Sequence, residues 1–221
     1  MDIVRVYKFY PAKWALAAIK NQRLKVSPIG ELNDPFEYLS VDVGRRDVRK
    51  WMQKLHGLIV GGNGIISFSR AWNEPLMWAH YADNHKGIAL GFDIPKHMLF
   101  EINYIENRIK PTIEVDHSEQ EMEELLDLIL RSKHKNWEYE GEFRLLRNLK
   151  NCVKADQLYF SKFNEVTLLK EVVFGDRYES QRELQLQKKL KNNGVDFTTA
   201  RPEFTGFKMT PQKLESKRKN L

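Results

Sequence analysis

Glutamate, arginine and apolar residues alternate along EYEGEFRLL, residues 138–146. Side chains two residues apart on a β-strand point to the same face, so the sequence predicts that Glu140, Glu142 and Arg144 share one face. Two neighbouring carboxylates repel each other, and such a pair needs a cation or a chemical task. One interpretation is a salt-bridged surface ladder with Arg144 as the cation. The functional alternative is that one glutamate polarises a hydroxyl or stabilises a cationic transition state while the other orients a substrate.

A second concentration of chemically versatile side chains is LMWAHYADNHKG, residues 76–87. On a helix Trp78 and Tyr81 are neighbours, whereas His80 shares another face with Asp83. We expect Trp78 to pack in the core. The Tyr81 ring is suited to stacking on a ligand while its hydroxyl forms a hydrogen bond. His80 and Asp83 either border that ligand or cap the end of the helix.

The spacing of ligating residues does not predict a metal site. His80 and His85 are five residues apart, whereas two metal ligands on one helix are normally three or four residues apart. A metal-dependent nuclease is one hypothesis for the function, the third beside the two given below, although nothing in the spacing requires it. Its Mg²⁺ ligands would be Asp34, Glu37, Glu140 and Glu142.

Two serines alternate in GIISFSR, residues 64–70. On a strand Ser67 and Ser69 share a face, which is either exposed to solvent or the floor of a polar cleft. The Gly-x-Ser-x-Gly turn of the serine hydrolases is absent from this segment, so a hydrolase triad is not supported.

The elements that must position these residues are a mixture of strands and helices. Periodicity and turn residues predict strands over residues 2–10, 64–70, 87–93, 139–147 and 169–175. They predict helices over residues 11–24, 46–59, 73–87, 118–137 and 180–190. The simplest architecture is a single α+β domain over residues 1–206, and we expect residues 207–221 to form a basic, flexible C-terminal tail.

Composition is that of a globular protein with a hydrophobic core. The chain has 221 residues, 42% of them hydrophobic, and a formal net charge of +6. This basic balance is compatible with nucleic-acid binding, although many globular proteins are simply basic. Cys152 is the single cysteine, so no internal disulfide forms. With no apolar leader and no segment of membrane-spanning length, we expect a cytoplasmic protein that does not bind membranes.

The order of these motifs resembles a widespread bacterial family known only as a domain of unknown function. The resemblance runs from about Val4 to Gly175. It rests on YKF at residues 7–9, LNDPFE at 32–37, SFS at 67–69, LMW-HYA at 76–82, HKG at 85–87, GFD at 91–93, and Trp137 with Glu140, Glu142, Phe143 and Arg144. This resemblance by itself implies no reaction.

A second resemblance is to the ADP-ribosyltransferases that use NAD. It implies two small, mostly antiparallel sheets that form a cleft with flanking helices. It also implies transfer of ADP-ribose from NAD to an unknown macromolecular acceptor, in a toxin or phage-defence setting. The catalytic residues implied are Glu142, Glu140 and Tyr81. The residues implied to bind the nucleotide are Tyr7, Lys8, Ser67, Ser69, Trp78 and His80.

The sequence departs from that second pattern at two positions. Lys8 stands where histidine or arginine is usual, and lysine lacks the forked geometry of an arginine. Phe68 stands where the serine motif has threonine. The alternative hypothesis is therefore a non-catalytic module that binds nucleic acid or protein through its basic and aromatic residues.

Overall fold

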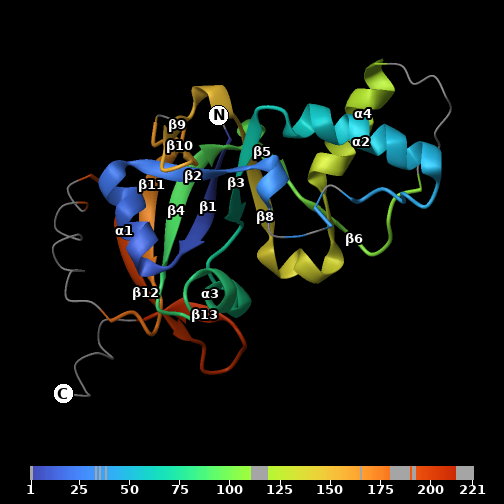
Figure 1. Ribbon diagram of the computed structural model, residues 1–221. Helices are drawn as coiled ribbons and strands as arrows, with labels where there is room; N and C mark the ends of the chain where they lie inside the picture. The colour runs from blue at the N-terminus through green and yellow to red at the C-terminus, as the bar shows by residue number, and fades with distance from the viewer. Residues whose placement is uncertain are drawn as a thin grey trace, which may run out of the picture. The chain divides into compact units, whose positions relative to one another are not determined.

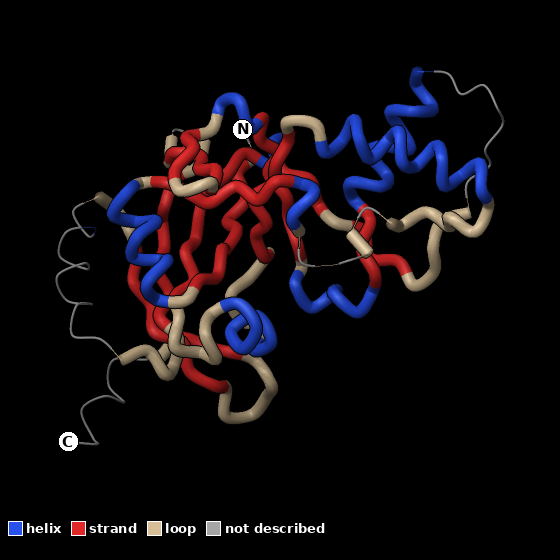
Figure 2. Tube along the Cα trace, viewed as in Figure 1, coloured by secondary structure: helices blue, strands red, loops and turns tan. Residues whose placement is uncertain are grey.

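The computed structural model describes residues 2–32, 34, 36–37, 39–110, 119–164, 166–179, 190 and 193–212. The chain forms two compact units. Unit 1 comprises Met1–Leu24, Phe68–Met98 and Lys162–Leu221, and unit 2 comprises Lys25–Ser67 and Leu99–Ser161. Figure 2 shows that strands predominate and helices are few, which confirms the predicted mixture of helices and mostly antiparallel strands. That residues 1–206 behave as one domain stays a prediction.

Unit 1 is built on a sheet whose central strand is β4 (Ile88–Pro95). On one side β4 pairs antiparallel with β1 (Ile3–Tyr10), in register from Ile3↔Pro95 to Tyr10↔Ile88. On the other side it pairs antiparallel with β11 (Leu168–Phe174). The strand is almost entirely buried, as its nearly continuous apolar sequence predicts.

Two further strands extend this sheet beyond β11. β12 (Asp196–Pro202) runs parallel to β11, and β13 (Met209–Pro211) pairs antiparallel with β12. Residues 209–211 of the segment predicted as a flexible tail therefore belong to the sheet. The remainder of that segment, residues 213–221, lies outside the described residues, as does the predicted helix 180–190 except Leu190.

Two helices of unit 1 begin within two residues of their predicted starts, and both end earlier than predicted (Figure 1). α1 (Ala12–Asn21) follows Pro11 and ends at Gln22, whose φ is 51°. α3 (Pro75–Tyr81) begins where the Glu74 carboxylate accepts a hydrogen bond from the Leu76 N–H. The 3-10 turn η2 (Lys96–Met98) follows β4.

α3 ends earlier than predicted. After Tyr81 the chain turns through Asp83, Asn84 and His85, whose φ values are 47°, 51° and 71°. Asp83 is therefore not on the helix, and the prediction that it shares a helical face with His80 is wrong.

Unit 2 contains short strands. β2 (Arg23–Pro28) pairs antiparallel with β3 (Asn63–Ser69), and β5 (Leu99–Glu101) pairs antiparallel with β8 (Glu142–Asn148), which lies beside β3. β9 (Val153–Ala155) and β10 (Leu158–Lys162) form a hairpin. β6 (Asn103–Ile105) and β7 (Ser132–His134) form a separate parallel pair.

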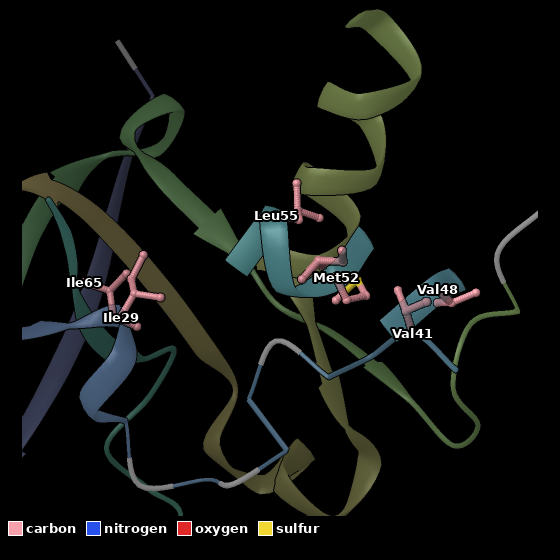
Figure 3. Close-up of a cluster of buried hydrophobic side chains, with 7 residues drawn as sticks. Ile29, Val41, Val48, Met52, Leu55 and Ile65 are labelled. Carbon is pink, nitrogen blue, oxygen red and sulfur yellow. The ribbon is translucent and has the colours of Figure 1, made fainter. Parts of the chain in front are cut away.

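The helices of unit 2 cover a buried apolar cluster (Figure 3). α2 (Arg46–Val60) contributes Val48, Met52 and Leu55, and this spacing confirms the predicted amphipathic helix. α4 (Glu119–Arg131) contributes Ile129. Three 3-10 turns complete the unit: η1 (Ile29–Glu31), η3 (Lys135–Glu140) and η4 (Leu149–Asn151).

The segment from Arg131 to Glu142 differs from the prediction. The helix expected to reach residue 137 stops at Arg131 and is followed by β7 and η3. The strand expected over 139–147 begins only at Glu142, because Gly141 has a φ of 48° and ends η3. Glu140 therefore belongs to η3 and not to one strand face with Glu142 and Arg144.

Candidate functional site

The predicted site residues divide between the two units. Ser67, Glu140 and Glu142 belong to unit 2. Tyr7, Lys8, Ser69, Trp78, His80 and Tyr81 belong to unit 1. Within unit 2 both glutamates contact a single lysine, and Ser67 contacts Glu142.

Three of the predicted residues in unit 1 are engaged in its sheet and core. The Tyr7 hydroxyl donates a hydrogen bond to Glu171 Oε2 at 2.8 Å, and burial with this bond raises the pKa of Tyr7. Trp78 is fully buried and its Nε1 donates to the Trp72 carbonyl at 2.6 Å. Ser69 Oγ donates to the Ala71 carbonyl at 3.0 Å. Trp78 therefore has the packing environment that its helical position predicts.

The other predicted residues of unit 1 are less buried. The Lys8 ammonium lies 5.6 Å from the ring centroid of Tyr10. The rings of His80 and Tyr81 lie 6.3 Å apart, with His80 exposed and Tyr81 half-buried. Their role as ligand-binding residues stays a prediction.

Lys133, on β7, is the centre of the polar cluster in unit 2. Its Nζ lies 2.5 Å from Glu140 Oε2 and 3.0 Å from Glu142 Oε2. Ser67 also forms a hydrogen bond to Glu142. The side chains of Lys133, Glu140 and Glu142 are 9%, 7% and 4% exposed, so these charges interact in a largely water-free environment.

Arg144 is the second cation of the cluster. Its Nε and Nη2 donate to the two Glu142 oxygens at 2.9 and 3.0 Å. The same Nη2 donates to Glu37 Oε1 at 2.6 Å, and Nη1 donates to the Leu130 carbonyl at 3.1 Å. We call Glu37, Lys133, Glu140, Glu142 and Arg144 the Lys133 cluster. The predicted pairing of Glu142 with Arg144 is thus present, but in the interior and not on a surface ladder.

The carboxylates of Glu142 and Glu37 differ in the direction in which their pKa is shifted. Burial by itself raises the pKa of Glu142, but Arg144, Lys133 and the Ser67 hydrogen bond outweigh it and lower this pKa to about 2. Burial raises the pKa of Glu37, against the opposing effect of Arg144. Glu142 is therefore ionised at neutral pH, whereas Glu37 takes up a proton more readily than an ordinary glutamate.

Lys133 also lines a cavity of about 740 Å³. Aromatic and polar side chains line it. They are Asp34, Phe36, Leu39, Ser40, Ile105, Glu106, Asn107, Arg108, Ser132, Lys133, His134, Asn136, Trp137 and Tyr139. Lys133 Nζ lies 4.9 Å from the Trp137 ring centroid, and the Arg108 guanidinium lies 5.7 Å from that of Phe36. We call this space the aromatic cavity.

Ser40 gives the aromatic cavity an unusual feature. The residue is 7% exposed, and its buried Oγ has no hydrogen-bond partner among the described residues. A buried hydroxyl without a partner costs about 1–3 kcal/mol. Rotation of the Ser40 side chain toward the cavity would give this hydroxyl a polar atom of a ligand as its partner.

Sequence reasoning missed Lys133 and Ser40. The alternating glutamates indicated that a cation was needed, and Arg144 was identified, but Lys133 lies on a three-residue strand without a recognisable pattern.

Among the described residues, no group of three or more His, Cys, Asp or Glu side chains could hold a metal ion. The nuclease hypothesis therefore has no support from this part of the chain.

Comparison with known proteins gives one match. Residues 77–145 match the family described as "Protein of unknown function (DUF2971)", which confirms the predicted resemblance to a family of unknown function over this segment. The segment is less than half of the chain and includes most of α3 and every member of the Lys133 cluster except Glu37. No curated protein and no solved structure matches the chain. No helix among the described residues is long and apolar enough to cross a membrane.

Proposed function

We propose that unit 2 binds NAD or a related nucleotide in the aromatic cavity and transfers ADP-ribose from it to a macromolecular acceptor. The position of Lys133 is the observation that carries this proposal. Lys133 lines the cavity, and its ammonium is paired with Glu140 and Glu142. One cation thus contacts two buried carboxylates and also lines a space of ligand size. The toxin or phage-defence setting and the cytoplasmic location stay predictions.

The lining of the aromatic cavity suits the parts of a dinucleotide. Its volume lies within the range of about 300–1,000 Å³ that is usual for ligand sites. The rings of Phe36, Trp137 and Tyr139 offer surfaces on which a planar base or nicotinamide can stack. The cations Lys133 and Arg108 match a pyrophosphate. Ser40 Oγ has no partner where it is buried, and rotation of this side chain toward the cavity would let it bind a ribose hydroxyl.

The charges of the Lys133 cluster suit the reaction. Three carboxylates face two cations, so the cluster holds an excess negative charge when all are ionised. When nicotinamide leaves NAD, positive charge develops on the ribose, and a fixed negative charge nearby stabilises it. With a pKa of about 2, Glu142 supplies that charge at neutral pH and does not act as a proton acceptor.

Access to the carboxylates requires that Lys133 change partners. In this proposal a ligand phosphate attracts the Lys133 ammonium into the cavity, and Glu140 and Glu142 then face the ribose. The bond between ribose C1′ and the nicotinamide nitrogen breaks, and its electron pair stays with nicotinamide. The acceptor nucleophile forms the new bond to C1′ and releases its proton to water. The catalytic role predicted for Tyr81 and the nucleotide-binding roles predicted for Tyr7, Lys8 and Ser69, all in unit 1, stay predictions.

Nicotinamide release from NAD tests this function, with nucleic acid and cell lysate supplied as acceptors. We expect release by the wild type and a loss of at least about 100-fold in Glu140→Gln and in Glu142→Gln, the order expected when a transition-state charge is removed. Glu106→Gln is the matched control. Glu106 also lines the cavity, but its side chain is exposed and pairs with Lys135 and not with Lys133. Melting curves of each variant establish that it folds.

Two results would overturn the proposal. One is the absence of both nicotinamide release and an NAD-induced rise in the melting temperature of the wild type. The other is release that persists in both variants of the cluster.

A further inference from the structure

The connection between β12 and β13 presents two phenylalanines to solvent. The strands pair at Pro202↔Met209, and the Glu203 N–H donates to the Lys208 carbonyl at 2.9 Å. At the turn between them Phe204 is 89% exposed and Phe207 is 98% exposed. We call residues 202–209 the aromatic hairpin; it lies at the red end of the described chain in Figure 1.

The aromatic hairpin has a defined local structure. The Glu203 carboxylate lies against Gly206, where a Cβ would displace it. The Arg201 guanidinium lies 4.2 Å from the Phe204 ring centroid, which fixes a cation beside the ring. The exposure of both rings is thus a feature of a folded turn. Neighbouring exposed aromatic residues of this kind mark interaction surfaces.

A polar cavity of about 490 Å³ lies at the base of the aromatic hairpin. Arg5, Arg70 and Lys208 line it together with Glu203. Arg5 is held by a two-fold contact to Asp93 on β4. The hydrogen bond from the Met209 N–H to the Asn73 carbonyl, 2.8 Å long, ties the hairpin to the segment that carries Arg70. The cavity that these cations line is therefore bounded by the strand ends of the hairpin, and Arg201 contacts the Phe204 ring.

We propose that the aromatic hairpin binds a single-stranded nucleic acid. Bases stack on Phe204 and Phe207, and the phosphates between them contact Lys208 and Arg70 at the mouth of the cavity. Proteins that bind single strands without sequence preference combine these two features, aromatic platforms and a cationic path for the backbone. This proposal concerns unit 1 and does not depend on the transferase proposed for unit 2.

Charge complementarity supports a polyanion as the occupant. From Arg201 to Leu221 the sequence has six Lys or Arg residues and two Glu residues. A lipid surface is the weaker match, because insertion into a bilayer interface requires a broad apolar face. Here Thr205 and Gly206 separate the two rings, and the acidic residue Glu203 directly precedes Phe204.

Fluorescence anisotropy of labelled single-stranded RNA and DNA oligonucleotides with the full chain tests the proposal. We expect Phe204→Ser/Phe207→Ser to weaken binding by at least about tenfold, because stacking accounts for much of the affinity per base. Lys208→Gln should reduce the slope of log affinity against log salt by about 0.7, the value for one lost phosphate contact. Trp14→Ala is the matched control: Trp14 is 56% exposed and has the Lys13 ammonium 4.9 Å from its ring centroid.

Three results would overturn the proposal. The first is the absence of salt-dependent binding to either oligonucleotide. The second is an equal loss of affinity in Trp14→Ala and in the double variant. The third is binding to vesicles of anionic phosphatidylglycerol without binding to oligonucleotides, which would identify the hairpin as a membrane contact. The transferase proposed for unit 2 is tested by nicotinamide release, which is a different assay, so failure of one proposal does not imply failure of the other.

Discussion

Removal of Arg144 is the most informative perturbation of the Lys133 cluster, because two buried carboxylates depend on this cation. Arg144 is 3% exposed and contacts both oxygens of Glu142 and one oxygen of Glu37. Arg144→Met removes the charge and keeps much of the length. Breaking a buried ion pair by removal of one partner costs about 3–5 kcal/mol. Since one kcal/mol corresponds to about 2–4 °C in a chain of this size, we expect the melting temperature to fall by about 6–20 °C.

The pH dependence of this loss follows from the pKa of Glu142. In the wild type this pKa is about 2, below the unfolded value of 4.5, so the stability that Glu142 contributes is complete above pH 4.5 and is lost as the pH falls toward 2. Without Arg144, burial dominates and the pKa values of Glu142 and Glu37 rise. Protonation then relieves the uncompensated charge. The difference in unfolding free energy between wild type and variant should therefore shrink as the pH falls from 7 to 4.

Urea unfolding at several pH values measures this difference directly. Arg45→Met is the control, because Arg45 pairs with Asp47 on the surface, where both side chains are more than half exposed. An exposed pair of this kind contributes at most about 1 kcal/mol. Equal losses in the two variants, or a loss in Arg144→Met that does not change with pH, would refute the assigned role of Arg144.

Other substitutions test the packing on which the two units depend. Gly91→Ala should destabilise unit 1 by about 1–3 kcal/mol, because the new Cβ would lie 2.9 Å from Tyr7 Cε1. Gly57→Ala in α2 should instead stabilise the chain by about 0.5–1 kcal/mol, because nothing lies within 4 Å of that Cβ; denaturant unfolding of both variants measures the contrast. Tyr104→Phe should cost about 1–3 kcal/mol, because the Glu142 N–H loses the Tyr104 hydroxyl as its acceptor. The pKa of Tyr104 is raised to about 12, chiefly by burial, so the stability it contributes should be present below pH 10 and lost as the pH rises through 12, and ultraviolet titration of wild type and Tyr104→Phe checks this.

Elements with long, regular patterns could be predicted from the sequence. The eight residues of β1 and the apolar run of β4 are long enough for their composition to identify strands. In α2 the apolar residues Val48, Met52 and Leu55 recur at helical spacing, which marks the buried face. The same regularity placed Glu142 and Arg144 on one strand, where they form an ion pair.

The site itself could be predicted only in part, because its other members are brought together by tertiary structure. Glu37 and Arg144 are 107 residues apart in the sequence, and no local pattern connects them. Lys133 lies on a strand of three residues, which is too short for alternation to be visible. Glu140 approaches Lys133 from a 3-10 turn that ends at Gly141, whose left-handed φ of 48° interrupts the expected strand.

Calorimetric titration of NAD into the wild type and into Ser40→Ala tests the central claim most directly. Ser40 lines the aromatic cavity, and its buried Oγ has no partner among the described residues, so the substitution should leave the melting temperature of the free protein unchanged or slightly higher. We predict that the wild type binds one NAD per chain and that Ser40→Ala binds it about tenfold more weakly, the loss expected for one hydrogen bond of about 1.4 kcal/mol. No binding to the wild type, or equal affinity in the two proteins, would contradict the assignment of this cavity as the nucleotide site.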